Sequence, residues 1–336
     1  MVCTIQNFGH APFPGMRWSE NTMIKYIIRR LIVLIPIIIG VTLVVFTILE
    51  MTPGDPAKMM LGDGATLEQF QAFNAKFGLD KPFVYRFFNY ILQLFTRFDF
   101  GTSWLTSRPV LDTLKARVPI TLIIAVSSIA FASIIGVSLG VISAVKQYSK
   151  LDYISRLTAM ILAAVPVFWL GMMLAILFAL KLGWLPSSGT GSWKHYILPM
   201  MTLGLPYSAR ILRSTRGYML EAVRQDFVRT ARSKGVPERV VIWKHAFLNA
   251  CLPVINTIGV YMGGLLGGAV VTENVFGCNG LGSFIINSVK RKDIPAVTGG
   301  TVFLAIIFAL ILLSVDILYA FVDPRIKARY TAKGAK

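Results

Sequence analysis

Charged residues and cysteines are scarce in this sequence. Charged side chains make up 15% of the 336 residues and hydrophobic ones 55%, a balance that excludes an ordinary soluble domain of this length. The three cysteines, Cys3, Cys251 and Cys278, form no CxxC pair, so we expect packing or surface residues rather than a disulfide framework. The sequence also has no G-x-x-x-x-G-K-[ST] phosphate loop, no metal-ligand cluster and no nucleophile with its base. We therefore expect neither an enzyme nor a cofactor or metal site in this chain.

Long apolar runs dominate instead. A helix needs about 20 apolar residues to cross the hydrocarbon core of a membrane. Five runs meet this length, and they are residues 31–49, 118–145, 157–180, 246–272 and 294–315, the last continuing to 322. A sixth run, residues 195–209, is shorter and contains Pro199 and Pro206. It reaches spanning length if Ile211 and Leu212 belong to it and the charged end of Arg210 extends to the membrane surface. We predict an all-α, polytopic membrane protein with six transmembrane helices.

Lysine and arginine set the predicted orientation. With six spans and both termini in the cytoplasm, the inner segments carry more Lys and Arg than the outer ones, as the positive-inside rule requires. The net charge of +18 is therefore interpreted as a topology signal, not as affinity for nucleic acid. Residues 1–22 lack the basic-then-apolar order of a signal peptide, and Met23 would be a more typical start, so we interpret them as an extension that is disordered or precedes the natural start.

The long segment predicted outside, residues 51–117, has helical order. Thr66 and Gln69 have capping-box spacing, and Gly78 suits the end of the helix that they begin. A second helix is predicted to start after Pro82. Its apolar face would carry Phe83, Phe87, Ile91 and Leu94. Such helices lie on the outer membrane surface or cap the bundle, or they also receive an extracellular partner, and the residues favour neither alternative.

The most basic loop lies in residues 213–245. Its stretch "EAVRQDFVRTARSKG" predicts a cytoplasmic amphipathic helix. The apolar face of that helix would carry Val223, Phe227 and Ala231. Gly235 suits its left-handed end, and Pro237 with Glu238 suits the first turn of the next helix. A DNA-binding helix-turn-helix has a similar outline, but both ends of this loop are tied to spans. From the residues alone, the loop either fixes topology or contacts a partner.

This loop also carries a family resemblance. "DFVRTARSKG" and the following "HAFLNACLPVI" resemble the cytoplasmic motif of binding-protein-dependent ABC importer permeases, particularly the dipeptide and oligopeptide branch. "RRLIVLIP", "MTPGDP", "FGLDKP", "FGTSW", "HYILP" and "DPRIKARY" resemble further landmarks of that branch in the same order, over nearly the whole chain after Met23. The sequence departs from the wider motif at Arg229 and Thr230, where Glu-Ala is usual before Ala231. It departs again at residues 277–279, where a Trp-Pro pair is common.

The resemblance implies the type I ABC importer permease fold in a bacterial cytoplasmic membrane. We divide the chain into an extension (1–22), a first transmembrane helix (23–50), an extracytoplasmic helical segment (51–117), a five-helix core (118–322) and a cytoplasmic tail (323–336). The core includes the coupling loop, residues 213–245, which would dock a short helix into a cytoplasmic ATPase. The residues expected at this contact are Arg229, Thr230, Ala231, Arg232, Ser233, Lys234, Gly235, Val236, Pro237 and Glu238.

The implied partners supply what this chain lacks. They are a second, homologous permease that completes a heterodimer, two ATPase subunits or domains that bind ATP and Mg, an extracellular solute-binding protein and the lipid bilayer. Nucleic acid is not among them. The predicted function is half of the translocation pore for di- or oligopeptides. Nickel or another small solute is the alternative cargo for the same machinery.

Five glycines in the predicted fifth span have helical spacing. They are Gly259, Gly263, Gly264, Gly267 and Gly268. Small residues at such spacing allow helix backbones to approach closely in lipid. They serve packing within the bundle, or they form the seam with the second permease along which substrate passes.

Charged residues within spans are default functional candidates because they are costly in lipid. Glu50 and Glu273 fall near outer ends, where we expect surface or gate roles. Asp316 lies deeper, and we expect it to pair with a cation or hydroxyl of another span. A proton relay needs more than one such buried acid, so a proton- or sodium-driven secondary carrier is the less favoured alternative.

Overall fold

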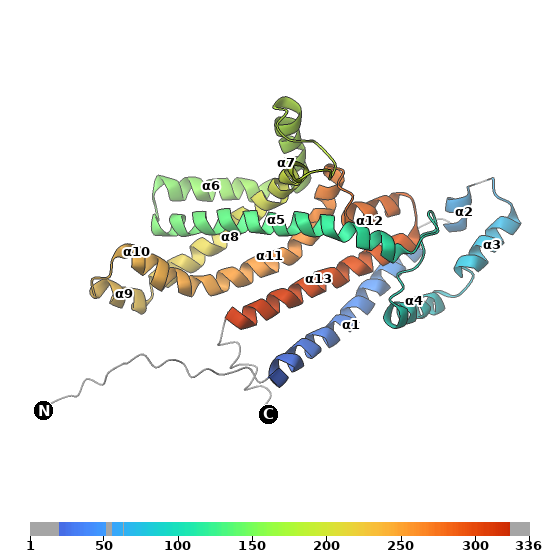
Figure 1. Ribbon diagram of the computed structural model, residues 1–336, viewed down its shortest axis with the longest axis horizontal. Coiled ribbons are helices and arrows are strands. Elements are labelled where there is room, and N and C mark those ends of the chain that lie inside the picture. Colours follow the sequence, from blue (N-terminus) through green and yellow to red (C-terminus); the bar gives the residue numbers. More distant parts are fainter. Residues whose placement is uncertain (1–19, 52–55, 63, 323–336) are drawn as a thin grey trace.

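The described residues of the computed structural model, 20–51, 56–62 and 64–322, are mainly helical. The predicted tail and most of the predicted N-terminal extension lie outside them. The α-helices are α1 (Glu20–Met51), α2 (Pro56–Leu61), α3 (Leu67–Phe77), α4 (Phe83–Arg97), α5 (Val110–Val145), α6 (Lys150–Ala164), α7 (Val167–Leu174), α8 (Ile197–Val223), α9 (Asp226–Ser233), α10 (Glu238–Val240), α11 (Leu248–Val275), α12 (Leu281–Lys290) and α13 (Ile294–Val322). They form an elongated bundle with α9 and α10 at one end and α2, α3, α4 and α12 toward the other (Figure 1).

Most of the predicted spans coincide with long apolar helices. Among the described residues, four segments are long and apolar enough to cross a membrane. The bent pair of α6 and Val167–Lys181, which comprises α7 and the π-helical segment after it, can be counted as a fifth. The four are Leu31–Met51, Val110–Val145, Glu238–Val275 and Ile294–Val315. The predicted span at 195–209 belongs to α8, which is too polar to meet the same measure, since Arg210 and Arg213 lie along it. The helices therefore establish an all-α membrane fold without fixing six as the number of spans.

The predicted continuous helix over residues 157–180 is broken. α6 ends at Ala164 and α7 begins at Val167, and the helical stretch Val167–Lys181 differs in direction from α6 by 104°. Pro166 explains the break, because it has no N–H to donate and forces the preceding residue out of helical geometry. Val165 accordingly has an extended ψ of 129°. As a result, α7 projects from the side of the bundle (Figure 1).

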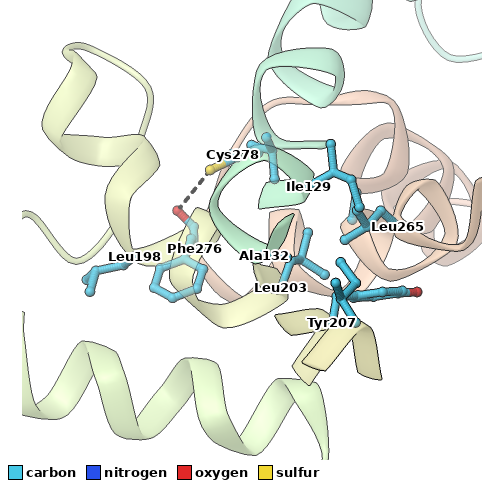
Figure 2. Close-up of a cluster of buried hydrophobic side chains, with 11 residues drawn as sticks. Ile129, Ala132, Leu198, Leu203, Tyr207, Leu265, Phe276 and Cys278 are labelled. Carbon is cyan, nitrogen blue, oxygen red and sulfur yellow. Dashed lines mark hydrogen bonds between the residues drawn. The ribbon is translucent and has the colours of Figure 1, made fainter. Parts of the chain in front are cut away.

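The centre of the bundle forms where α5, α8 and α11 meet. Its buried side chains include Ile129 and Ala132 of α5, Leu203 and Tyr207 of α8, and Leu265 of α11 (Figure 2). A Cβ at position 136 of α5 would lie 2.7 Å from the Cβ of Ile211, so only glycine allows α5 to approach α8 this closely. Cys278, also in this cluster, is buried as the packing residue expected from sequence.

The two helices predicted in residues 51–117 are confirmed as α3 and α4. Thr66 and Gln69 form both hydrogen bonds of a capping box at the start of α3, and Gly78 ends that helix with a φ of 64°. Pro82 precedes α4 as expected. On the predicted apolar face of α4, Phe87 and Leu94 are buried.

Candidate functional site

The short helix α9 rests on the ends of its neighbours. Val228 and Ala231 are buried, and they pack in one cluster with side chains from α5, α8, α11 and the intervening π-helical segment Val241–Phe247. The other members of this cluster are Val141, Ala144, Met219, Ala222, Val241, Ala246 and Ala250. All but Met219 are small or β-branched, so α9 lies close against the bundle and has little room to shift independently of it.

One part of the predicted apolar face is wrong. Phe227 is 41% exposed, and the neighbouring Val228 takes the buried position instead. The reason is that α8 and α9 are separate helices: α8 ends at Val223, and Gln225 is extended with a ψ of 152°. The break changes the register, so spacing counted from Val223 cannot be continued into α9.

The bend after α9 has the predicted geometry. Gly235 has a φ of 72°, in the left-handed region, and its N–H donates to the carbonyl oxygen of Arg232 over 2.9 Å. Pro237 then precedes the first turn of α10. A Cβ at position 235 would have no heavy atom within 4 Å. Glycine is therefore required here by the backbone conformation and not by crowding.

An ion pair spans the bend. The Arg232 guanidinium donates from Nη2 to Oε1 of Glu238 over 2.6 Å and from Nε to Oε2 over 3.1 Å. These hydrogen bonds to Glu238 raise the pKa of Arg232 above its ordinary value. Both residues were expected at the partner contact, but nothing in their spacing predicted that they pair with each other.

Most of the predicted contact residues face outward. Ala231 is buried and Val236 is half-buried, whereas the other members of the set are exposed. The exposed members are Arg229, Thr230, Arg232, Ser233, Lys234, Gly235, Pro237 and Glu238. Together with Phe227 they form a surface of basic, polar and apolar side chains at one end of the bundle.

A buried carboxylate stiffens the base under α9. Asp152 of α6 is fully buried, and it accepts two hydrogen bonds from Arg216 of α8, over 2.8 and 2.9 Å. It also accepts from Ser143 Oγ of α5 over 2.5 Å and from the Tyr148 N–H over 3.1 Å. This network joins α5, α6 and α8. Sequence reasoning missed this network, because its members are up to 73 residues apart in the chain. Only Asp152 and Ser149, the residue that caps α6, form a local signal.

Glu273, at the other end of α11, does not have the expected surface role. It is fully buried, with Oε1 accepting from Thr121 Oγ1 of α5 over 2.6 Å and Oε2 accepting from the N–H of Ser283 over 3.0 Å. Thr121 in turn accepts from the N–H of Leu281 over 2.9 Å. Glu273 and Thr121 together therefore satisfy free N–H groups at the start of α12 and tie that helix to α5. Glu50 remains partly exposed and pairs with Arg86 of α4.

Four of the five predicted glycines pack within the chain. A Cβ at Gly259 or Gly263 would meet Val315 or Phe308 of α13. At Gly264 and Gly268 it would meet Tyr207 and Leu203 of α8. At Gly267 it would have no heavy atom within 4 Å, so this glycine lies open along α11. Asp316 lies in α13, but its side chain is outside the described part of the structure.

Comparison with known families and proteins gives consistent matches. Residues 136–328 match the family described as the binding-protein-dependent transport system inner membrane component, and residues 23–125 match its N-terminal membrane component. The dipeptide transport system permease protein DppB of Alkalihalophilus pseudofirmus is 38% identical over 333 residues, which cover 91% of this chain and 100% of that protein. The glutathione transport system permease protein GsiC of Escherichia coli K12 is 39% identical over 305 residues, covering 91% and 99%.

Two solved structures share the fold. The MetNI methionine ABC transporter, in inward facing conformations, has a chain that aligns with a TM-score of 0.52 and 19% identity, covering 63% of this chain and 96% of that one. A crystal structure of an amino acid ABC transporter with histidines aligns with a TM-score of 0.50 and 14% identity, covering 64% and 94%. At such low identity these structures bear on the fold alone.

Proposed function

The chain belongs to the binding-protein-dependent transport system inner membrane components, the permease subunits of ABC importers, and we propose that it forms half of a pore for di- or oligopeptides. The relatives named for dipeptide and glutathione transport support this class of cargo. As a permease subunit it is not an enzyme. The ATP and Mg of the transport cycle are bound by partner ATPases.

The coupling proposal rests on the packing of α9 against the bundle. Its Val228 and Ala231 are held against the ends of α5, α8 and α11, while Phe227 and the basic side chains around it are exposed. A partner that moves α9 therefore moves several long helices with it. In the proposed cycle, closure of two ATPases draws the coupling loops of two permeases together, and the pore opens toward the binding protein.

The proposed topology places α9 and both termini in the cytoplasm. Six crossings are obtained if α6 with α7 forms one span and α8 another, in addition to the four long apolar segments. The arginines of α8 are accommodated because its apolar side chains are buried against α5 and α11 while Arg213 is exposed toward the α9 end. The second permease would complete a heterodimer, with the open edge at Gly267 on α11 as the candidate seam.

Reconstitution tests this function directly. The chain is placed in proteoliposomes with its second permease, both ATPases and the binding protein, and uptake of a labelled dipeptide is measured with and without ATP. We expect uptake only when ATP and the ATPases are present. Uptake by this chain alone, driven by a proton or sodium gradient, would instead identify a secondary carrier. Uptake of nickel but not of peptides would mean that the chain is still a permease of an ATP-driven importer, but that its cargo is nickel.

A further inference from the structure

The helix α4 has three faces of different chemistry. The face toward the bundle carries the buried or half-buried Phe83, Phe87, Tyr90, Ile91 and Leu94. A second face is apolar and exposed, and carries Val84, Tyr85, Phe88, Leu92 and Phe95. A third face is polar, and carries Arg86, Asn89, Gln93, Thr96 and Arg97. At about 100° per residue these sets occupy successive arcs around the helix. The exposed surface of α4 is therefore divided into one apolar and one polar half.

The neighbouring helix α3 does not share this pattern. Its phenylalanines are partly buried, and Phe73 and Phe77 each have ring centroids 5.5 Å from that of Trp104. Its exposed side chains are mainly polar or small. They include Glu68, Gln69, Gln71, Ala75 and Lys76. The exposed apolar face is thus a property of α4 and not of the whole segment outside the bundle.

Contacts with α1 fix the depth of α4. The ring of Phe46 in α1 lies 5.8 Å from Phe87 and 5.2 Å from Tyr90, and Arg86 donates to both carboxylate oxygens of Glu50 over 2.7 Å. The apolar segment of α1, Leu31–Met51, has 21 residues and a length of about 31 Å, close to the thickness of a hydrocarbon core. Phe46 precedes the end of this segment by about 7 Å, at 1.5 Å per residue. α4 therefore lies alongside the last two turns of a membrane span.

We propose that α4 is an interfacial membrane helix whose exposed apolar face inserts into the lipid leaflet at the Met51 end of α1. The depth given by Phe46 is within the roughly 5–10 Å at which interfacial helices bury their apolar side. Arg86 and Arg97 lie on the polar face, where they meet headgroups and water. Tyr85 is of the aromatic type enriched at this level, and Phe88 is typical of the apolar face of an interfacial helix. The proposal is independent of cargo and of the coupling loop, and it holds for either orientation of the chain.

This assignment gives α4 a mechanical role. Its bundle face contacts α1, and α1 packs along α13, so the helix attaches the rim of the bundle to the membrane surface. Figure 1 shows α4 beside the end of α1, away from α9 and α10. The occupant of the apolar face is lipid, because that face is at the depth of the apolar residues of α1 and a water-soluble partner docks beyond the headgroups.

Spin labels on adjacent residues test the proposal. Single cysteines replace Phe88 on the apolar face, Asn89 on the polar face and Ala75 on α3, in the complete transporter in discs of phosphatidylcholine and phosphatidylglycerol, without binding protein. A sample without an introduced cysteine measures the background of the natural ones. Collisions with oxygen, which dissolves in lipid, are compared with collisions with a water-soluble nickel chelate. We expect F88C to favour oxygen and N89C and A75C to favour the chelate.

Two results would overturn it. One is chelate access at position 88 equal to that at position 89, which would place the face in water. The other is shielding at position 88 that appears only when the binding protein is added, which would assign the face to a protein. Leu92→Cys lies on the same face and gives the same comparison if F88C does not assemble.

Discussion

Arg232 and Glu238 join α9 to α10 by two hydrogen bonds across the left-handed Gly235, so the bend is closed by side chains as well as by the backbone. The pair is exposed, and an exposed ion pair contributes only about 0.2–1 kcal/mol to folding. Its importance under the coupling proposal lies in holding α9 and α10 at one angle. Its loss should therefore affect transport more than stability.

Charge reversal separates these effects. Arg232→Glu places two carboxylates together and opens the bend, so we expect more ATP hydrolysed per peptide taken up, with little change in thermal stability. The double variant Arg232→Glu with Glu238→Arg should restore much of the wild-type ratio, because the pair is rebuilt with opposite polarity. Uptake and hydrolysis measured in the same proteoliposomes give the ratio. A wild-type ratio in Arg232→Glu would show that the pair has no part in coupling.

Gly235→Val should uncouple ATP hydrolysis from uptake while leaving the chain inserted in the membrane. A non-glycine residue in the left-handed conformation costs about 1–2 kcal/mol, and a β-branched one is especially unfavourable, so the bend should adopt another geometry. No atom lies near enough to clash, so the bundle should remain intact. The matched control is Gly217→Val in α8, which also faces open space but has no left-handed φ. Normal coupling in Gly235→Val would exclude the bend as a coupling element.

Asp152→Asn should lower the stability of the bundle. The substitution leaves the partly buried Arg216 without its carboxylate, and breaking such a pair costs about 3–5 kcal/mol, toward the lower end here because Arg216 retains some access to water. Asp226→Asn is the control, because Asp226 is 98% exposed and its 3.9 Å pair with Arg229 should contribute almost nothing. Thermal unfolding in detergent compares the two. Equal unfolding temperatures would mean that the buried network does not stiffen the base of α9.

The two kinds of glycine on α11 should respond differently to alanine. Gly259→Ala brings a methyl group against Val315 of α13, and such overpacking typically costs about 1–3 kcal/mol. Gly267→Ala meets no atom of this chain and should not destabilise it. Gly267→Leu should then weaken co-purification of the second permease if the seam passes there. Unchanged assembly and uptake in Gly267→Leu would remove this position from the seam.

Local features of the fold were predictable from sequence. The capping box of Thr66 and Gln69 and the left-handed ends at Gly78 and Gly235 depend on residues within a few positions of one another, and each has the expected geometry. The apolar runs likewise predict membrane helices, because lipid requires about 20 apolar residues in succession. Pro166 was a visible signal for the break between α6 and α7, but it lies inside an uninterrupted apolar run that suggested a continuous span.

Contacts distant in sequence were not predictable. Asp152 meets Arg216, and Glu273 meets Thr121, only when their helices pack together. The sequence around each carboxylate therefore did not reveal that it is buried. The prediction of the buried face of α9 was wrong at Phe227 for a related reason. The extended Gln225 interrupts a pattern that otherwise continues smoothly from α8, so Val228 is buried where Phe227 was expected to be.

Photo-crosslinking from position 227 can detect the proposed contact between α9 and the ATPase, because Phe227 is an exposed aromatic residue on α9. It is replaced by the photoreactive p-benzoylphenylalanine, and the control carries the same replacement at the exposed Phe95 of α4, toward the other end of the bundle. After irradiation of the complete transporter, we predict a covalent adduct with an ATPase subunit from position 227 and none from position 95. Absence of an ATPase adduct at position 227, in a complex that still takes up peptide, would contradict the assignment of α9 as the contact with the ATPase.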